Sequence, residues 1–337
     1  MLRHLEEQSV IGSGISDPVM YYKWPLALHW RGRDDGALRL LGWIAHRSLT
    51  GEGDFASARA GFHQEFHSYA NLWLTWAAAE LGGSKLIRQT FSFLLKHQNA
   101  ETGGLATNPT DKRVPYEDPL STSFLGIVAC ALDLEDVARS VLQYLSGLLD
   151  KQAETPGGRA GHAPPGRPSD QAGQDRPGHF SVCCFWLRTL PDGTLVTEVP
   201  KGADPATFVI ELGKREQCHY FFGAMCYFLA RYMETSGLQE ARELAHRIAG
   251  LLEGAGKEAL STIWAAKVGP GGIALYSVTG DDRYLQLAWP VVDAVLDAQR
   301  PEGCWLKDGQ PWLTVSAEQC AWLTDIARRL TAMGGKQ

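Results

Sequence analysis

Residues 217–252 decide the fold and read QCHYFFGAMCYFLARYMETSGLQEARELAHRIAGLL. The first half is apolar and aromatic on every side, which is typical of a buried helix. The second half places Leu244, Ile248 and Leu252 at helical spacing, which is typical of an amphipathic surface helix. Gly237 stands between the halves, where a helix C-cap is expected. We therefore predict a unit made of a buried inner helix followed by an outer helix that covers it.

The rest of the chain repeats this unit, which indicates an internally repetitive fold. We expect six inner and five outer helices, because the last inner helix has no outer helix after it. The expected inner helices span 17–31, 62–81, 118–132, 217–236, 257–280 and 314–333, the fifth being broken or kinked at 269–272. The expected outer helices span 36–49, 86–98, 134–152, 238–252 and 281–299. Repeated helical hairpins of this kind predict an all-α, double-layered (α/α)6 barrel that forms one domain over residues 1–337.

Residues 155–216 interrupt the helical pattern. Their first part is rich in Gly, Pro and charge, which is typical of a loop. The following segment alternates in the manner of strands around Pro191-Asp192-Gly193, a strong turn signal, so we expect an inserted β-hairpin. We interpret the insertion as a lid that folds over the barrel mouth and excludes water.

Three turns share a pattern in which a glutamine ends an outer helix and a glycine follows. They are Gln98 with Gly103, Gln152 with Gly157, and Gln299 with Gly303. This pattern resembles the terminal-glutamine turns of the α/α-toroid superfamily. Its members include terpenoid cyclases, protein prenyltransferase β chains, and six-hairpin glycosidases and epimerases. The resemblance implies a closed barrel with a central site, although an open helical solenoid would carry the same turns.

Composition and motifs exclude several classes of function. The 337 residues carry a formal net charge of −6, which gives no electrostatic reason to expect a nucleic-acid partner. No stretch is apolar and long enough for a membrane span, and no secretory signal is recognisable, so we expect a cytoplasmic protein. Glycine-rich nucleotide motifs, HExxH and CxxC are absent, so we expect neither a cofactor nor a metal site. No DxDD motif supports a terpene-cyclase protonation site, and Asp34-Asp35 and Asp281-Asp282 are interpreted as helix caps.

Polar side chains gather where the expected inner helices begin, and in an α/α barrel these ends converge on one end of the central cavity. The expected catalytic residues are His219, His67 and Asp118. The expected substrate-binding residues are Tyr21, Lys23, Trp24, Tyr69, Thr122, Gln217, Tyr220, Trp264 and Lys267.

Histidine suits proton transfer because its pKa lies near working pH. Two histidines across a cavity permit proton abstraction on one face and delivery on the other, and sugar 2-epimerases of the superfamily are similar in using paired histidines. We expect Lys267 to bind an anionic substrate group or to bridge to Glu216 or Glu318, because a buried lysine needs a partner.

The favoured hypothesis is a cofactor-independent isomerase, cyclase or lyase acting on a small terpenoid-like or sugar-like molecule in an aromatic-lined cavity. A glycosidase or unsaturated-uronyl hydrolase is the first alternative, and it would need two facing carboxylates, Asp118 with Glu216 or Glu318. The second alternative is a non-enzymatic small-molecule binding protein, which a barrel filled by its own tryptophans would favour. Asp118 is equally well explained as the N-cap of its helix.

Overall fold

The computed structural model describes residues 18–56, 65–109, 115–154, 184–237 and 239–335, and its helices form two layers. Inner helices contact one another in a closed ring, in chain order and back to the first. They are α2 (Trp24–Trp30), α5 (His67–Glu80), α7 (Pro119–Ala131), α9 (Tyr220–Ser236), α12 (Val268–Thr279) and α14 (Leu313–Gly334). This ring confirms the predicted all-α barrel.

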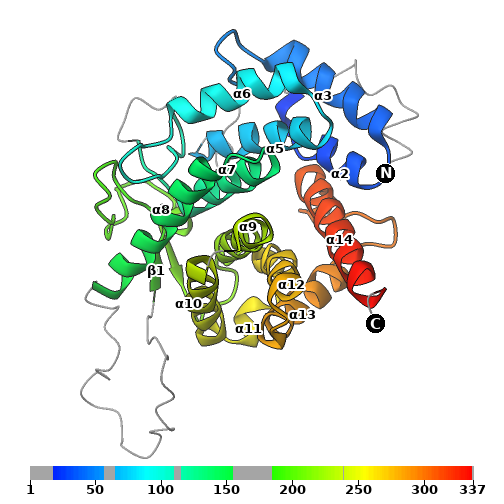
Figure 1. Ribbon diagram of the computed structural model, residues 1–337. Helices are drawn as coiled ribbons and strands as arrows, with labels where there is room; N and C mark the ends of the chain where they lie inside the picture. Colours follow the sequence, from blue (N-terminus) through cyan, green and yellow to red (C-terminus); the bar gives the residue numbers. More distant parts are fainter. Residues whose placement is uncertain (1–17, 57–64, 110–114, 155–183, 238, 336–337) are drawn as a thin grey trace, which may run out of the picture.

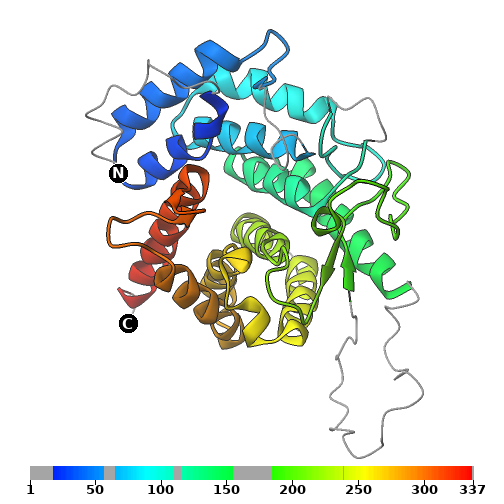
Figure 2. The ribbon, with the colours of Figure 1, turned by 180° about the vertical axis from the view of Figure 1, so that it is seen from behind.

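Outer helices cover the ring from outside, as Figures 1 and 2 show for α3, α6 and α8 along α2, α5 and α7. The outer helices are α3 (Asp34–Ser48), α6 (Ser84–Lys96), α8 (Glu135–Glu154), α10 (Gln239–Ala255) and α13 (Asp282–Asp297). Within the described ranges no outer helix follows α14, as expected from the sequence. Short elements complete the chain: η1 (Pro18–Tyr21), α11 (Lys257–Leu260), η4 (Ile263–Ala265), and the strands β3 (Leu306–Lys307) and β4 (Gln310–Pro311).

Burial follows the sequence pattern that predicted the two layers. In α7 every residue from Pro119 to Cys130 is buried, as expected of an inner helix. In α10 the buried side chains recur at helical spacing, as expected of an amphipathic one. Gly237 ends α9 in the left-handed conformation with φ 64°, which a residue without Cβ adopts without strain. Asp281 caps α13 by accepting a hydrogen bond from the Arg283 amide.

Two expectations about helix ends are wrong. Asp34 does not cap α3; it lies in the first turn and its carboxylate contacts the His29 ring. The segment Gly269–Gly272 does not break the fifth inner helix; α12 begins at Val268 and continues through it. Pro270 is tolerated there because the first turn of a helix leaves its amide groups unused.

Glycines let α9 and α12 pack with their backbones in close contact. A Cβ on Gly223 would lie 2.1 Å from the carbonyl carbon of Lys267, and one on Gly271 would lie 2.5 Å from the Gly223 oxygen. Only glycine fits at such an approach. This contact fixes the position of Lys267 along the axis of α9.

The inserted segment contains less β-structure than expected. Strand β1 (Cys184–Trp186) pairs antiparallel with β2 (Val209–Glu211), not with the segment directly after the turn. The predicted hairpin is reduced to one β-bridge between Thr189 and Leu195. In the turn between them, the Thr194 amide donates a hydrogen bond to the Asp192 carboxylate. A short helix, η3 (Pro205–Thr207), precedes β2. Residues 155–183, which carry nearly half of the predicted lid, lie outside the described part of the chain.

The described part of the chain has no helix that is both long and apolar enough to cross a membrane.

Candidate functional site

Aromatic side chains from opposite sides of the ring fill the middle of the barrel. Trp73 lies 5.6 Å from Trp322 and 5.3 Å from Phe124, ring centre to ring centre, and Trp76 lies 6.0 Å from Tyr227. Trp30 closes the layer beneath them, 5.2 Å from Trp76. The expected open aromatic cavity is therefore wrong for this depth, because the rings pack against one another and leave the barrel plugged.

A polar layer lies on top of this plug, toward the leading ends of the inner helices. Glu318 stands one helical turn before Trp322, and Tyr69 stands one turn before Trp73, so both face the barrel axis. Lys23 and Lys267 occupy the N-cap positions of α2 and α12. These four residues and Tyr220, the first residue of α9, are called the floor below.

Two lysines share one carboxylate at the centre of the floor. Lys23 donates to one oxygen of Glu318, and the Lys267 Nζ lies 2.5 Å from the other. Each side chain exposes only 6–7% of its surface. Two ammonium ions and one carboxylate would leave a net positive charge in a nearly dry place, and burying an unbalanced charge is costly.

The pKa shifts of the floor residues express the same imbalance. Burial alone would raise the pKa of Glu318, but attraction to Lys23 and Lys267 lowers it to about 2, so the carboxylate stays ionised. Burial lowers the pKa of both lysines, and Glu318 offsets part of the effect. Repulsion by Lys23 lowers the pKa of Lys267 further. The imbalance therefore favours the loss of a proton from one of the two lysines.

Aromatic rings enclose the lysine nitrogens. The Lys23 Nζ lies 5.2 Å, 5.5 Å and 5.7 Å from the ring centres of Tyr22, Tyr69 and Trp73. The Lys267 Nζ lies 4.5 Å from the Tyr220 ring, which remains partly exposed. Burial raises the pKa of Tyr220 well above its ordinary value, so this hydroxyl stays protonated. Lys23 and Lys267 are equally buried, but the partly exposed ring lies beside Lys267 and carries a proton donor.

The structure places His219 away from the floor. It directly precedes Tyr220, and successive helical positions point about 100° apart. The His219 ring is fully buried near Phe222, and among the described residues neither ring nitrogen has a hydrogen-bond partner. Burial lowers the pKa of His219, which nearby carbonyl groups of Leu212 and Gln217 offset only in part.

His67 and Asp118 lie at the same end of the barrel but make structural contacts. The His67 Nε2 lies 2.7 Å from the Asp54 carboxylate in the turn after α3, and Asn71 donates to the same oxygen. Asp118 accepts the Ser121 amide at 2.8 Å, so its capping role is confirmed. Its second oxygen accepts from the Thr107 hydroxyl.

Other expected site residues divide in the same way. Lys23, Tyr69, Tyr220 and Lys267 meet on the floor. Thr122 accepts the Leu105 amide, and Gln217 accepts the Glu211 amide, so both tie loops together. The rest of the expected set contacts other parts of the mouth or core: Tyr21 packs against Trp43, Trp24 is buried, and Trp264 is 39% exposed with its ring 6.4 Å from Trp312.

Sequence reasoning missed the central role of Glu318 and the existence of a further buried cation, Arg188. Glu318 was considered only as a partner for Lys267 or as a hydrolase carboxylate. The spacing of Glu318, Trp322, Asp325 and Arg329 marks one face of α14 and could have identified it. Arg188 lies in the insertion, where no periodicity indicates which way a side chain points.

Arg188 joins the insertion to the barrel. Its guanidinium donates to the Thr207 carbonyl, the Thr107 hydroxyl and the Glu65 carboxylate, and it lies 3.8 Å from Asp118. It is also stacked 4.5 Å over the Phe66 ring. The described part of the insertion is therefore anchored at the leading ends of α5 and α7.

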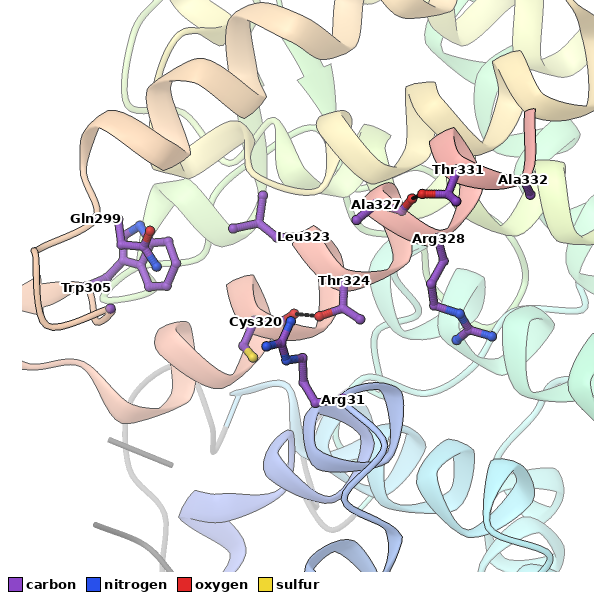
Figure 3. A pocket seen from close by; sticks show the side chains of 11 residues that line it. Arg31, Gln299, Trp305, Cys320, Leu323, Thr324, Ala327, Arg328, Thr331 and Ala332 are labelled. Atoms are coloured by element: carbon purple, nitrogen blue, oxygen red, sulfur yellow. Dashed lines mark hydrogen bonds between the residues drawn. The ribbon is translucent and has the colours of Figure 1, made fainter. Parts of the chain in front are cut away.

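A groove of 760 Å³ lies far from the floor, on the outer face of α14. Figure 3 shows its lining, with Arg31 next to Cys320 and Thr324. It occupies the position that an outer helix would cover elsewhere in the ring. No buried polar cluster faces it among the described residues, so we do not place the candidate site there.

No group of three or more His, Cys, Asp or Glu side chains that could hold a metal ion occurs in the described ranges. The floor itself offers one carboxylate between two lysines, a donor set that repels cations.

Comparison with known proteins shows the fold. No protein-family model matches the chain, and no curated protein does. Among solved structures it is similar to a D-mannose isomerase, with 11% identity, TM-score 0.59, and coverage of 93% of this chain and 87% of that one. It is also similar to a cellobiose 2-epimerase from Spirochaeta thermophila DSM 6192, with 14% identity, TM-score 0.57, and coverage of 94% of this chain and 87% of that one. A third similar structure is an unsaturated glucuronyl hydrolase specific for heparin, with 9% identity, TM-score 0.57, and coverage of 92% of this chain and 86% of that one. The chain therefore has the α/α-toroid fold of these structures.

Proposed function

We propose that this protein is a cofactor-independent acid–base isomerase or epimerase that acts on the open-chain carbonyl form of a small sugar. The observation that carries the proposal is the floor, where Lys23 and Lys267 share Glu318 inside an aromatic wall. One carboxylate balances one ammonium ion. A neutral amine on one lysine beside an ammonium ion on the other is therefore the arrangement with the lowest net charge, and we assign the neutral amine to Lys267, which lies beside the partly exposed Tyr220.

These two groups suit enolisation. The Lys267 amine takes the proton from the carbon next to the carbonyl group. The Lys23 ammonium, held in place by Glu318, stabilises the negative charge that develops on the carbonyl oxygen. The Tyr220 hydroxyl, which burial keeps protonated, returns a proton to the intermediate.

Sugar isomerisation agrees better with the floor than the terpenoid and hydrolase alternatives do, whereas the aromatic plug by itself would equally suit a non-enzymatic binding protein. A terpenoid carbocation would be repelled by the lysines. A two-carboxylate hydrolase needs a protonated carboxyl group, whereas Glu318 has a pKa of about 2 and both oxygens of Asp118 accept hydrogen bonds. Structures of similar fold include a D-mannose isomerase and a cellobiose 2-epimerase, which supports sugars as the substrate class.

Solvent deuterium exchange tests the proposal. Mannose, glucose, fructose and cellobiose are incubated with the protein in D2O, and label at the carbon next to the carbonyl is measured by NMR. We expect wild type to exchange at least one of them and Lys267→Met to lose the exchange by about a thousandfold, within the range of acid–base catalysis.

His219→Gln is the matched comparison, because His219 was the base expected from sequence but faces away from the floor. We expect folded His219→Gln to retain exchange. Loss of exchange in this variant with retention in Lys267→Met would show that the base is His219. Absence of exchange in wild type with every sugar tested would remove the proposed function.

A further inference from the structure

We propose that the floor has a second reaction: it captures short aldehydes covalently, as an imine on Lys267. The observation behind it is that two lysine nitrogens share one buried carboxylate, so that keeping both charged without an added anion is costly. A lysine made neutral by a neighbouring cation is a nucleophile toward carbonyl carbon.

Geometry identifies Lys267 as the reactive amine. The rings of Tyr22, Tyr69 and Trp73, which lie around Lys23, are all buried. Lys267 borders Tyr220, whose ring is partly exposed. Among the described residues Glu318 is the hydrogen-bond partner of Lys267, which leaves the rest of its nitrogen for a ligand.

The step needs no cofactor and no change of oxidation state. The Lys267 lone pair forms a C–N bond to the aldehyde carbon, the carbonyl π electrons move to oxygen, and this oxygen takes a proton from the Lys267 nitrogen. The resulting carbinolamine loses its hydroxyl group as water, using a proton from the Lys23 ammonium, while the nitrogen lone pair forms the C=N bond. The product is a protonated imine on Lys267 beside a neutral Lys23, so the total charge is unchanged. One water molecule is released for each aldehyde captured.

Capture and proton abstraction use the same lone pair, so the inference rests on the neutral amine of the proposed function but not on its substrate. An aldehyde without a neighbouring hydroxyl group cannot isomerise to a ketose. Such an aldehyde occupies the amine and competes with sugars. We therefore expect acetaldehyde to inhibit any sugar exchange reversibly.

Reductive trapping provides the test. The full-length protein is incubated with acetaldehyde and cyanoborohydride at pH 7, and ethylated lysines are located by peptide mass spectrometry. We expect Lys267 to be labelled at least about tenfold faster than the exposed Lys214, because the neutral amine attacks the aldehyde and an ammonium ion does not.

Two variants complete the experiment. Lys267→Met should lose the fast-labelled site, whereas Lys214→Met should keep it. Labelling of Lys267 no faster than that of Lys214 in wild type would overturn the inference, and this reading does not depend on how any variant folds. Sugar exchange without fast labelling would leave the proposed function standing alone, and fast labelling without sugar exchange would leave the capture reaction alone.

Discussion

At the scale of single residues, charge balance on the floor couples stability to function. Glu318 is held by two lysines, and removing it would leave buried cations without a partner. Removing Lys267 instead would leave one balanced pair, Lys23 with Glu318. Sites that carry out chemistry often keep such an unfavourable group at the expense of stability.

Substitutions at these two positions should therefore act in opposite directions. We expect Glu318→Gln to lower the free energy of unfolding by about 3 kcal/mol or more, because it breaks a buried charge pair. We expect Lys267→Met to raise it by about 1 kcal/mol while abolishing exchange. Urea denaturation measures both. Equal destabilisation by the two changes would contradict the charge-balance account.

Acid should weaken the protein partly through Glu318. Its pKa falls from 4.5 to about 2 on folding, so its contribution is present above pH 4.5 and is lost as the pH falls toward 2. The difference corresponds to about 3 kcal/mol. We expect the unfolding free energy of wild type to fall more steeply between pH 5 and pH 2 than that of Glu318→Gln, and parallel curves would disagree with the assigned pKa.

At the scale of helices, the contact between α9 and α12 sets the position of Lys267. Gly223 meets the backbone of Lys267 and Val268, so α9 cannot carry a side chain at that point without moving α12. Tyr220 stands one turn earlier on α9, beside Lys267. The position of the Lys267 amine relative to the Tyr220 hydroxyl therefore depends on Gly223.

Gly223→Ala tests this dependence. We expect it to lower the unfolding free energy by about 3 kcal/mol, at the upper end of the cost of overpacking, and to reduce exchange by shifting Lys267. Gly254→Ala is the control, since a Cβ on Gly254 in α10 meets nothing within 4 Å. The control should be neutral or slightly stabilising in thermal unfolding. Comparable melting temperatures for the two variants would show that α12 can move away from the added methyl group without a loss of stability.

At the scale of the whole molecule, Arg188 connects segments that are far apart in sequence. It is fully buried and bonds to Thr207, Thr107 and Glu65, which belong to the insertion and to the leading ends of the barrel helices. Phe66, under its guanidinium, packs on Phe221 beside Tyr220. A continuous series of side-chain contacts therefore links the insertion to the floor.

Arg188→Met should loosen this connection. We expect a loss of about 3 kcal/mol of stability and faster amide exchange of residues 184–211, because the buried carboxylate of Asp118 loses its nearby cation. Arg139→Met removes an exposed pair with Glu135 and should change stability by less than about 1 kcal/mol. Unchanged amide exchange in the insertion of Arg188→Met would show that other contacts hold it.

The sequence by itself determined the alternation of buried and covering helices, because helical periodicity and all-round apolarity are local properties of each segment. It also determined that polar residues begin the inner helices. The tertiary structure alone decided which of them meet, because that depends on the rotation of each helix about its own axis. Lys23 and Glu318 pair across 295 residues, whereas His219 points away although it adjoins Tyr220. Ring closure makes the floor, and no segment read alone contains that information.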